Sequence, residues 1–164
     1  MATAMGTEHP PEVVVAIERE GGVVVAQRRA RLYAAALGFA RQAQWEVATA
    51  VSEAAANMLK YARSGHIVLR AVGNTGHVLE FEAVDRGSGI ADLALAMKDG
   101  VSEGRDLTVD AAAGHRRGLG LGLGAIRRLM DDLQVFSTGD GTRLVARKSR
   151  MLPDGWPAPR GHRS

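Results

Sequence analysis

The sequence predicts an α+β fold, a two-layer sandwich in which helices cover one face of a mostly antiparallel sheet. Short β-branched or alternating segments come in pairs separated by glycine-containing turns, which is typical of antiparallel hairpins. Three longer segments carry apolar residues every three or four positions, which is typical of helices buried on one side. The 164 residues suffice for one domain with a hydrophobic core.

The first half of the domain is predicted to contain one strand and two helices. The β-branched run Val13–Ile17 indicates a strand, which Gly21 and Gly22 are expected to break. Apolar periodicity then predicts one helix over 23–37 and another over about 44–62. The second helix should bury the side chains of Val47, Val51, Ala54, Met58 and Leu59.

The second half of the domain supplies most of the sheet. Alternating segments predict strands in two pairs, 67–72 with 78–84 and 133–137 with 142–148. A short helix is expected over 91–97 and a longer one over about 124–133. Residues 100–117 mix Gly, Ser, Asp and Arg without a period, so we expect a long loop there.

The composition limits the class of protein. We expect the folded domain to span 13–150, because 1–12 and 151–164 hold glycine and proline without periodicity and indicate a flexible lead and a disordered tail. No apolar run is long enough to span a membrane, and no signal-peptide pattern opens the chain, so we expect a cytoplasmic protein. The absence of cysteine excludes disulfides, thiolate catalysis and cysteine-ligated metal.

Arginine makes the chain basic, with a net charge of +3 and a pI of about 9.8. A nucleic-acid partner would need aromatic side chains for base stacking, and the chain has only three Phe, two Tyr and two Trp. We therefore attribute the charge to solvated surfaces and to a phosphate-facing cluster, and expect no nucleic-acid partner.

A polar stripe runs along the helix predicted over 44–62. Glu53, Asn57 and Lys60 lie three or four residues apart, so they share one side of that helix. A carboxylate and an amide oxygen on adjacent turns make a magnesium half-site, because Mg²⁺ prefers oxygen ligands and keeps several waters. The alternative is a solvated helix face without a ligand.

A second candidate site residue ends the strand predicted over 78–84. Alternation places Asp85 on the same face as Phe81 and Ala83, where a carboxylate needs a hydrogen-bond donor. An adenine amino group is a fitting donor, and Gly87 and Gly89 would leave room for a flat ring. The alternative is an Asp-x-Gly turn in which the carboxylate binds its own backbone.

The strongest signal is a run of glycines at alternate positions before the last predicted helix, namely Gly118, Gly120, Gly122 and Gly124. Such a run leaves backbone N–H groups bare at the positive end of a helix, which predicts a phosphate cradle. Part of the run also fits a dinucleotide-binding loop, but that loop needs a preceding hydrophobic strand, which the sequence lacks. Arg117, just before the run, is expected either to reach the phosphates or to be solvated.

In this order the three motifs resemble those of the GHKL ATPases, which include histidine-kinase catalytic domains, gyrase and MutL. The N box of that superfamily is similar to Glu53-x-x-x-Asn57, its first glycine box to residues 85–90, and its second to residues 118–122. The resemblance implies the Bergerat ATP-binding fold. Within the superfamily the chain is most similar to the small serine/threonine kinases of bacterial partner switching, the RsbT, RsbW and SpoIIAB group.

This resemblance implies a kinase that binds ATP and Mg²⁺ and phosphorylates a serine or threonine of a STAS-domain antagonist. It implies that Glu53 accepts the proton of the substrate hydroxyl, that Asn57 ligates Mg²⁺, and that Asp85 holds the adenine amino group. The other residues expected to bind the nucleotide are Gly87, Gly89, Ile90, Gly118, Gly120, Gly122 and Arg117. A second partner is implied as well, either a sigma factor or a PP2C-type phosphatase, and a homodimer is possible.

Other functions stay open beside the kinase. The chain could be an ATP-binding anti-sigma factor or partner-binding module that transfers little phosphate, and only a kinase would label its partner from ATP. A detached histidine-kinase catalytic domain is less expected, because no dimerisation helix with a phosphorylatable histidine precedes the domain. A stand-alone ATPase is less expected because no second domain would transduce hydrolysis.

Overall fold

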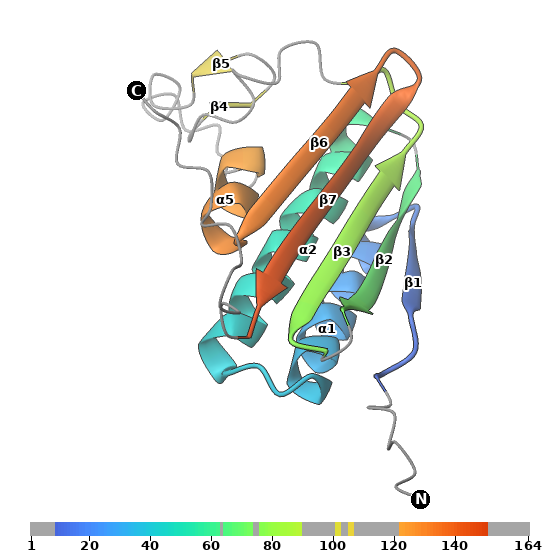
Figure 1. Cartoon of the computed structure of the whole chain (residues 1–164). Coiled ribbons are helices and arrows are strands. Elements are labelled where there is room, and N and C mark those ends of the chain that lie inside the picture. The colour runs from blue at the N-terminus through green and yellow to red at the C-terminus, as the bar shows by residue number, and fades with distance from the viewer. Residues whose placement is uncertain are drawn as a thin grey trace, which may run out of the picture.

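The structure is a computed structural model that describes residues 9–62, 64–73, 76–89, 101–102, 105–106 and 122–150. Its main sheet has the strand order β1-β2-β3-β7-β6, and every neighbouring pair is antiparallel. The strands of this sheet are β1 (Val13–Ile17), β2 (Gly65–Val72), β3 (Val78–Asp85), β6 (Asp132–Thr138) and β7 (Gly141–Ser149). The helices α1 (Glu20–Ala36), α2 (Arg41–Tyr61) and α5 (Gly122–Leu129) lie on one face of the sheet, behind it in Figure 1. The predicted α+β sandwich is confirmed.

The core lies between the helices and the sheet, with α2 in contact with both α1 and α5. The predicted buried positions of α2 are confirmed except for Leu59, which is only partly buried. The largest fully buried side chains come from both layers: Phe81, Ile17, Ile67, Leu69, Leu79, Ile126, Val47 and Val51. Burial of each such side chain stabilises the fold by about 1.5–3 kcal/mol. This packing fixes the rotation of α2 and therefore the direction of its polar stripe.

The first helix begins at Glu20 and includes Gly21 and Gly22, so the predicted helix start at residue 23 was wrong. Both glycines lie in the first turn of α1, where several backbone N–H groups lack intrahelical partners in any case. A Cβ on Gly22 would lie only 2.8 Å from the carbonyl oxygen of Ala16. Glycine there lets α1 start close against β1, so the residue type reflects this packing.

The last helix ends at Leu129, so the predicted range 124–133 was too long. The backbone N–H of Asp131 donates to the carbonyl oxygen of Arg147 at 2.9 Å, and the Asp131 carboxylate accepts the N–H of Ser149 at 2.6 Å. These contacts join the chain to β7 directly after the helix. Leu133, the residue shared by the predicted helix and the predicted strand 133–137, lies in β6.

The segment 100–117 contains more structure than the predicted loop. The two-residue strands β4 (Val101–Ser102) and β5 (Arg105–Asp106) pair antiparallel in a small sheet of their own. The helix predicted over 91–97, the lead before residue 9 and the tail after residue 150 lie outside the described residues. Among the described helices, none combines the length and apolar character that a bilayer crossing requires.

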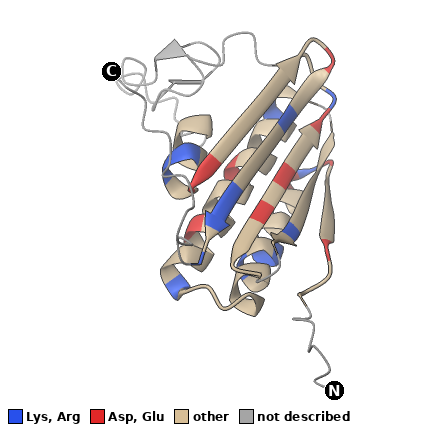
Figure 2. Ribbon diagram, in the orientation of Figure 1, with Lys and Arg blue, Asp and Glu red and all other residues tan. Residues whose placement is uncertain are grey.

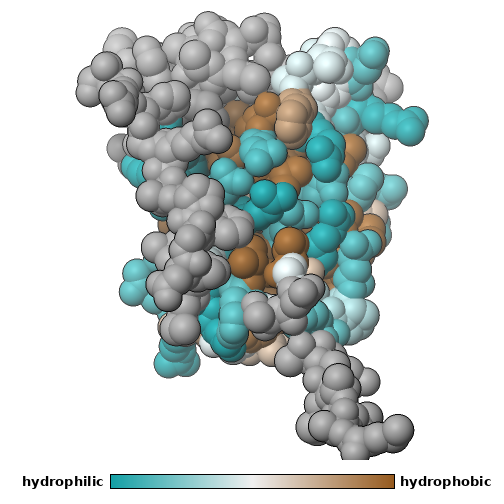
Figure 3. Space-filling model, in the orientation of Figure 1, coloured by the Kyte–Doolittle hydropathy of each residue, from teal (hydrophilic) through white to brown (hydrophobic). Residues whose placement is uncertain are grey.

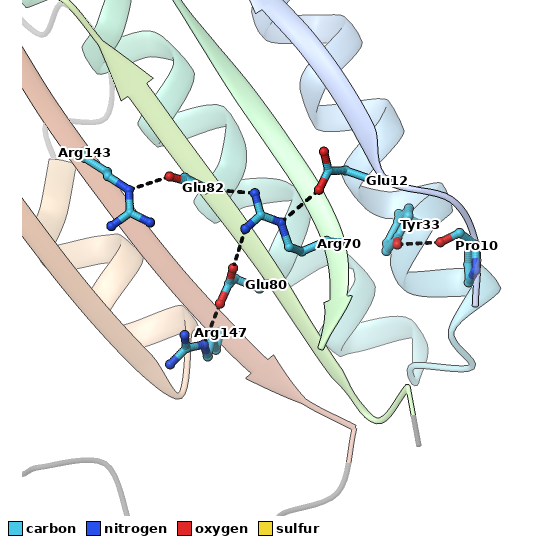
Figure 4. Close-up of polar contacts among 8 residues, drawn as sticks. All are labelled: Pro10, Glu12, Tyr33, Arg70, Glu80, Glu82, Arg143 and Arg147. Atoms are coloured by element: carbon cyan, nitrogen blue, oxygen red, sulfur yellow. Dashed lines mark hydrogen bonds and ion pairs between the residues drawn. The ribbon is translucent and has the colours of Figure 1, made fainter. Parts of the chain in front are cut away.

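The sheet face without helices is covered by its own charged side chains, which we call the charge lattice (Figures 2 and 4): Glu12, Arg70, Glu80, Glu82, Arg143 and Arg147. Arg70 on β2 reaches Glu80 at 3.2 Å and Glu82 at 2.8 Å on the neighbouring β3. Long arginine stems shield the strands, and Glu80 is only 6% exposed on a face that no helix covers. Figure 3 shows hydrophilic side chains across the centre of this face.

Candidate active site

The end of β3, the turn between β6 and β7 and the end of α2 meet at one end of the sheet, the upper end in Figure 1. β3 ends there at Asp85, and the turn at Gly139 and Asp140 joins β6 to β7 there. The last turns of α2 pass behind the same end. α5 starts at Gly122, lower in the view and beside β6. α2 contacts both other motifs, through Glu53 and Gly122 at the start of α5 and through Tyr61 and Gly87 after β3.

Glu53 lies half-buried on α2 and points toward the start of α5. The backbone N–H of Gly122 donates a hydrogen bond to its carboxylate. Burial raises the pKa of Glu53 above its usual value of 4.5, and the hydrogen bond from Gly122, which lowers the pKa, does not cancel that effect. A carboxylate that holds a proton more readily than usual is suited to act as a general base.

Gly122 is the first residue of α5 and adopts a φ of +43°, which favours glycine. A Cβ at this position would meet nothing within 4 Å, so the backbone angle and not crowding favours glycine here. The N–H groups at the start of a helix carry a partial positive charge and attract anions. In this structure one of them already binds the carboxylate of Glu53.

Asn57 lies one turn after Glu53 on α2 and is also half-buried. Its amide oxygen and the Glu53 carboxylate therefore share one side of the helix, as predicted. Among the described residues no group of three or more His, Asp or Glu side chains gathers to hold a metal.

Asp85 forms one of the two alternatives that its sequence left open, and the adenine role stays a prediction. Its Oδ1 accepts the backbone N–H of Gly87 at 3.0 Å, which is the predicted Asp-x-Gly turn. The same Oδ1 accepts the backbone N–H of Thr142 on β7 at 3.2 Å. Both hydrogen bonds that the described residues give this carboxylate fall on Oδ1, so Oδ2 is available for an amino donor such as that of adenine.

Gly87 and Gly89 are required by close packing around Asp85. A Cβ on Gly87 would lie 2.8 Å from the carbonyl oxygen of Tyr61, at the end of α2. Gly89 has a φ of +75°, and a Cβ there would collide with the carbonyl oxygen of Thr138 at the end of β6. The glycines therefore hold the end of β3 between α2 and β6, and this role alone accounts for their residue type.

Three residues around Asp85 were missed from the sequence as site residues. A Cβ on Gly65 would lie 3.2 Å from Cβ of Asp85, and one on Gly141 would collide with the Asp85 carbonyl oxygen. Thr142 supplies the N–H described above. Gly141 stands out in the sequence only as a turn residue, and Gly65 only as a residue before a strand. Their closeness to Asp85 follows from strand register.

Several predicted site residues lie outside the described part of the chain. These are Ile90, Arg117, Gly118 and Gly120. Their roles in the phosphate and adenine sites stay predictions.

Comparison with known proteins identifies the family. The profile of the histidine kinase-like ATPase domain matches residues 18–148, which is most of the chain. The chain belongs to this family. This histidine kinase-like ATPase domain is also 36% identical over 136 residues to the serine/threonine-protein kinase RsbT of Bacillus subtilis (strain 168), a match that covers 82% of this chain and 93% of RsbT. The resemblance to the RsbT group of GHKL kinases is confirmed.

Among solved structures, the histidine kinase-like ATPase domain is similar to full-length ShkA in complex with AMPPNP. The TM-score is 0.46 and the sequence identity 17%, and the match covers 90% of this chain. It covers 34% of the ShkA chain, so this domain corresponds to about a third of that protein.

Proposed function

We propose that this chain is an ATP-dependent serine/threonine-protein kinase that phosphorylates a STAS-domain protein in a bacterial partner-switching pathway. The family of the domain and its similarity to the kinase RsbT support ATP binding and phosphoryl transfer. The STAS substrate is supported by the resemblance of the N box and glycine boxes to those of the partner-switching kinases.

The observation that carries the proposal is the contact between the Glu53 carboxylate and the backbone N–H of Gly122. It places a carboxylate of raised pKa at the start of the helix that follows the glycine run. Phosphoryl transfer needs mainly positioning of the nucleophile and neutralisation of phosphate charge. A base beside a phosphate-binding helix start meets both needs.

In the proposed reaction, Glu53 accepts the proton of the substrate hydroxyl while the hydroxyl oxygen attacks the γ-phosphorus. The bond from that phosphorus to the oxygen of ADP breaks, and the phosphoryl group moves to the serine or threonine. Asp85 would hold the adenine amino group through Oδ2. Mg²⁺, when bound through Asn57 and the phosphates, would neutralise their charge.

The glycine-rich segment would complete the site by wrapping the phosphates. Gly118 and Gly120 would contribute backbone N–H groups together with Gly122, and Arg117 would add a positive side chain. Ile90, Gly87 and Gly89 would line the adenine side. These assignments rest on the motif resemblance.

The same resemblance leads us to propose a second protein partner, which is either a sigma factor or a PP2C-type phosphatase. From the same resemblance we also propose that the chain forms a homodimer. Pull-down of each candidate with the full chain, followed by measurement of the mass of the complex in solution, would decide between them.

The test is transfer of radiolabelled phosphate from Mg-ATP to a purified STAS-domain protein. We expect labelling of the STAS protein on serine or threonine with the wild-type chain and none with Glu53→Gln. The alternative, an ATP-dependent binding module, predicts that the chain binds ATP and the STAS protein but leaves the latter unlabelled. That result would overturn the kinase proposal.

A further inference from the structure

A groove of about 460 Å³ runs between α1 and α2. Its walls are formed by Glu20, Val23 and Val24 of α1 and by Ala56, Leu59 and Lys60 of α2. Val24 is 64% exposed, so the groove opens to solvent with an apolar rim. α1 and α2 are joined by a short connection and pack side by side, so the first turns of α1 lie beside the last turns of α2.

The surface of α1 beside the groove alternates apolar and cationic side chains. Val24, Arg28 and Leu32 are exposed at four-residue spacing and form one stripe, and Val25 and Arg29 are exposed next to them. No ion pair joins Arg28 or Arg29 to another of the described residues. A partner that covers this surface must offer apolar side chains to the groove and negative charge to the arginines.

Along α2, the groove lies within two helical turns of the candidate base. Ala56 and Lys60 follow Glu53 by about one and two helical turns. A rise of seven residues is only about 10 Å. Glu53 itself points toward α5, on the other flank of α2 from α1, so a segment bound in the groove would bring a serine or threonine to Glu53 only through residues that extend across α2 (Figure 1).

We infer that this groove is the docking site of the protein substrate and that it receives an amphipathic helix with acidic flanks. That a helix docks here is argued from the groove and from the positive charge of Arg28 and Arg29 beside it. That this helix belongs to the kinase substrate rests on the proposed function. A second copy of the chain would bring Arg28 and Arg29 against the same arginines, so charge disfavours self-association here. A lipid bilayer presents a flat surface that would not fill the groove. A third helix would fill it, because the ridge of one helix packs into the groove between two others.

Binding of a defined peptide tests this inference directly. The probe is a fluorescein-labelled helical peptide of about 18 residues with leucines at every third or fourth position and glutamates on the flanks. The control peptide has lysines in place of the glutamates. We expect fluorescence anisotropy to give a dissociation constant about tenfold lower for the glutamate peptide, because only it complements Arg28 and Arg29.

Two matched pairs of variants locate the binding site. Val24→Glu places a negative charge on the groove rim, and Val14→Glu makes the same change at a valine of β1 that is 61% exposed and outside the groove. We expect Val24→Glu to weaken glutamate-peptide binding about tenfold and Val14→Glu to change it less than about twofold. Ala56→Trp, which fills the groove, and Ala35→Trp, at an exposed position of α1 outside it, should give the same contrast.

The possible outcomes separate the groove from the kinase activity. The inference is overturned if Val24→Glu and Ala56→Trp bind the peptide like the wild type, if the lysine peptide binds equally well, or if anionic phosphatidylserine vesicles compete better than the peptide. If the peptide results hold but the STAS protein stays unlabelled, the proposed function fails and the groove stands. If labelling proceeds equally in both groove variants, the groove fails as the substrate site and the kinase stands.

Discussion

Two glutamates on opposite sides of the sheet show how surroundings assign different tasks to the same residue type. Glu53 lies in the helix layer and Glu82 in the charge lattice of the open face. Burial by itself would raise the pKa of both carboxyl groups. In Glu82 the hydrogen bonds from Arg143 and Arg70 outweigh burial and bring the pKa below its usual value, whereas the N–H of Gly122 leaves Glu53 above it.

The difference separates a structural carboxylate from a functional one. Glu82 is held by two arginines, so its charge is compensated and its oxygens are engaged. Glu53 receives one neutral donor in the described part of the chain and keeps the capacity to take up a proton. A perturbed carboxylate without a fixed cation at the end of a sheet is a stronger functional candidate than one inside an ion-pair network.

The largest expected effect is the loss of phosphate transfer when Glu53 is replaced. Glu53→Gln keeps the shape of the side chain and removes the base, so kcat for phosphate transfer to the STAS protein should fall about 10²- to 10⁴-fold. Nucleotide affinity, measured with a fluorescent ATP analogue, should stay within about threefold of the wild type, because the adenine site is separate. Unchanged transfer would contradict the role of Glu53.

A matched control for this variant is Glu18→Gln, at an exposed position between β1 and α1. It removes the same charge away from the site, so kcat should not change. A comparable loss in Glu18→Gln would mean that net charge, and not the base, governs the rate.

The next effect concerns Asp85, a carboxylate whose two oxygens divide the roles seen in Glu53 and Glu82. Oδ1 is held by Gly87 and Thr142, and Oδ2 is the proposed acceptor for adenine. Asp85→Asn weakens a charge-assisted hydrogen bond, so ATP affinity should fall about 10- to 100-fold. Calorimetric titration with ATP measures this, and affinity equal to that of the wild type would refute the adenine role.

The fold could be predicted from the sequence largely because periodicity records burial. Val13–Ile17 was predicted as a strand with its observed limits, and the hairpin at Gly139 and Asp140 was also found. Periodicity could not locate the end of α5, because Leu133 has a position that suits a helix and a strand alike. The hydrogen bond from Asp131 to Arg147, far along the chain, decides for the strand.

The candidate site was only partly predictable for a related reason. Glu53 and Asn57 lie within one helix, so their spacing alone places them together. The contact between Glu53 and Gly122 and the contact between Asp85 and Thr142 join distant segments, and no local pattern encodes them. The charge lattice was missed as well, because Arg70, Glu80 and Arg147 become neighbours only through strand pairing.

A third prediction tests the structural side of the comparison. Arg70→Met keeps an apolar stem over the sheet and removes the cation shared by Glu80 and Glu82. The free energy of unfolding should fall by about 1–3 kcal/mol, because Glu80 is buried and loses a donor. Urea denaturation measures the loss. Arg143→Met, at a more exposed arginine that pairs with Glu82 and lies over the Phe136 ring, should cost less than about 1 kcal/mol.

The smallest effect is also the sharpest test, because the two glutamates should respond to pH with opposite signs. The pKa of Glu82 is lowered in the folded state, so the stability it contributes is present above 4.5 and is lost as the pH falls through the folded value. Glu82→Gln should therefore be less stable than the wild type at pH 7, and the difference should shrink in acid. The pKa of Glu53 is raised, so its contribution is present below 4.5 and is lost as the pH rises through the folded value. Glu53→Gln should be at least as stable as the wild type at pH 7. Urea denaturation at pH 7 and pH 4 measures both, and a loss of stability in Glu53→Gln at pH 7 would place Glu53 with the structural carboxylates.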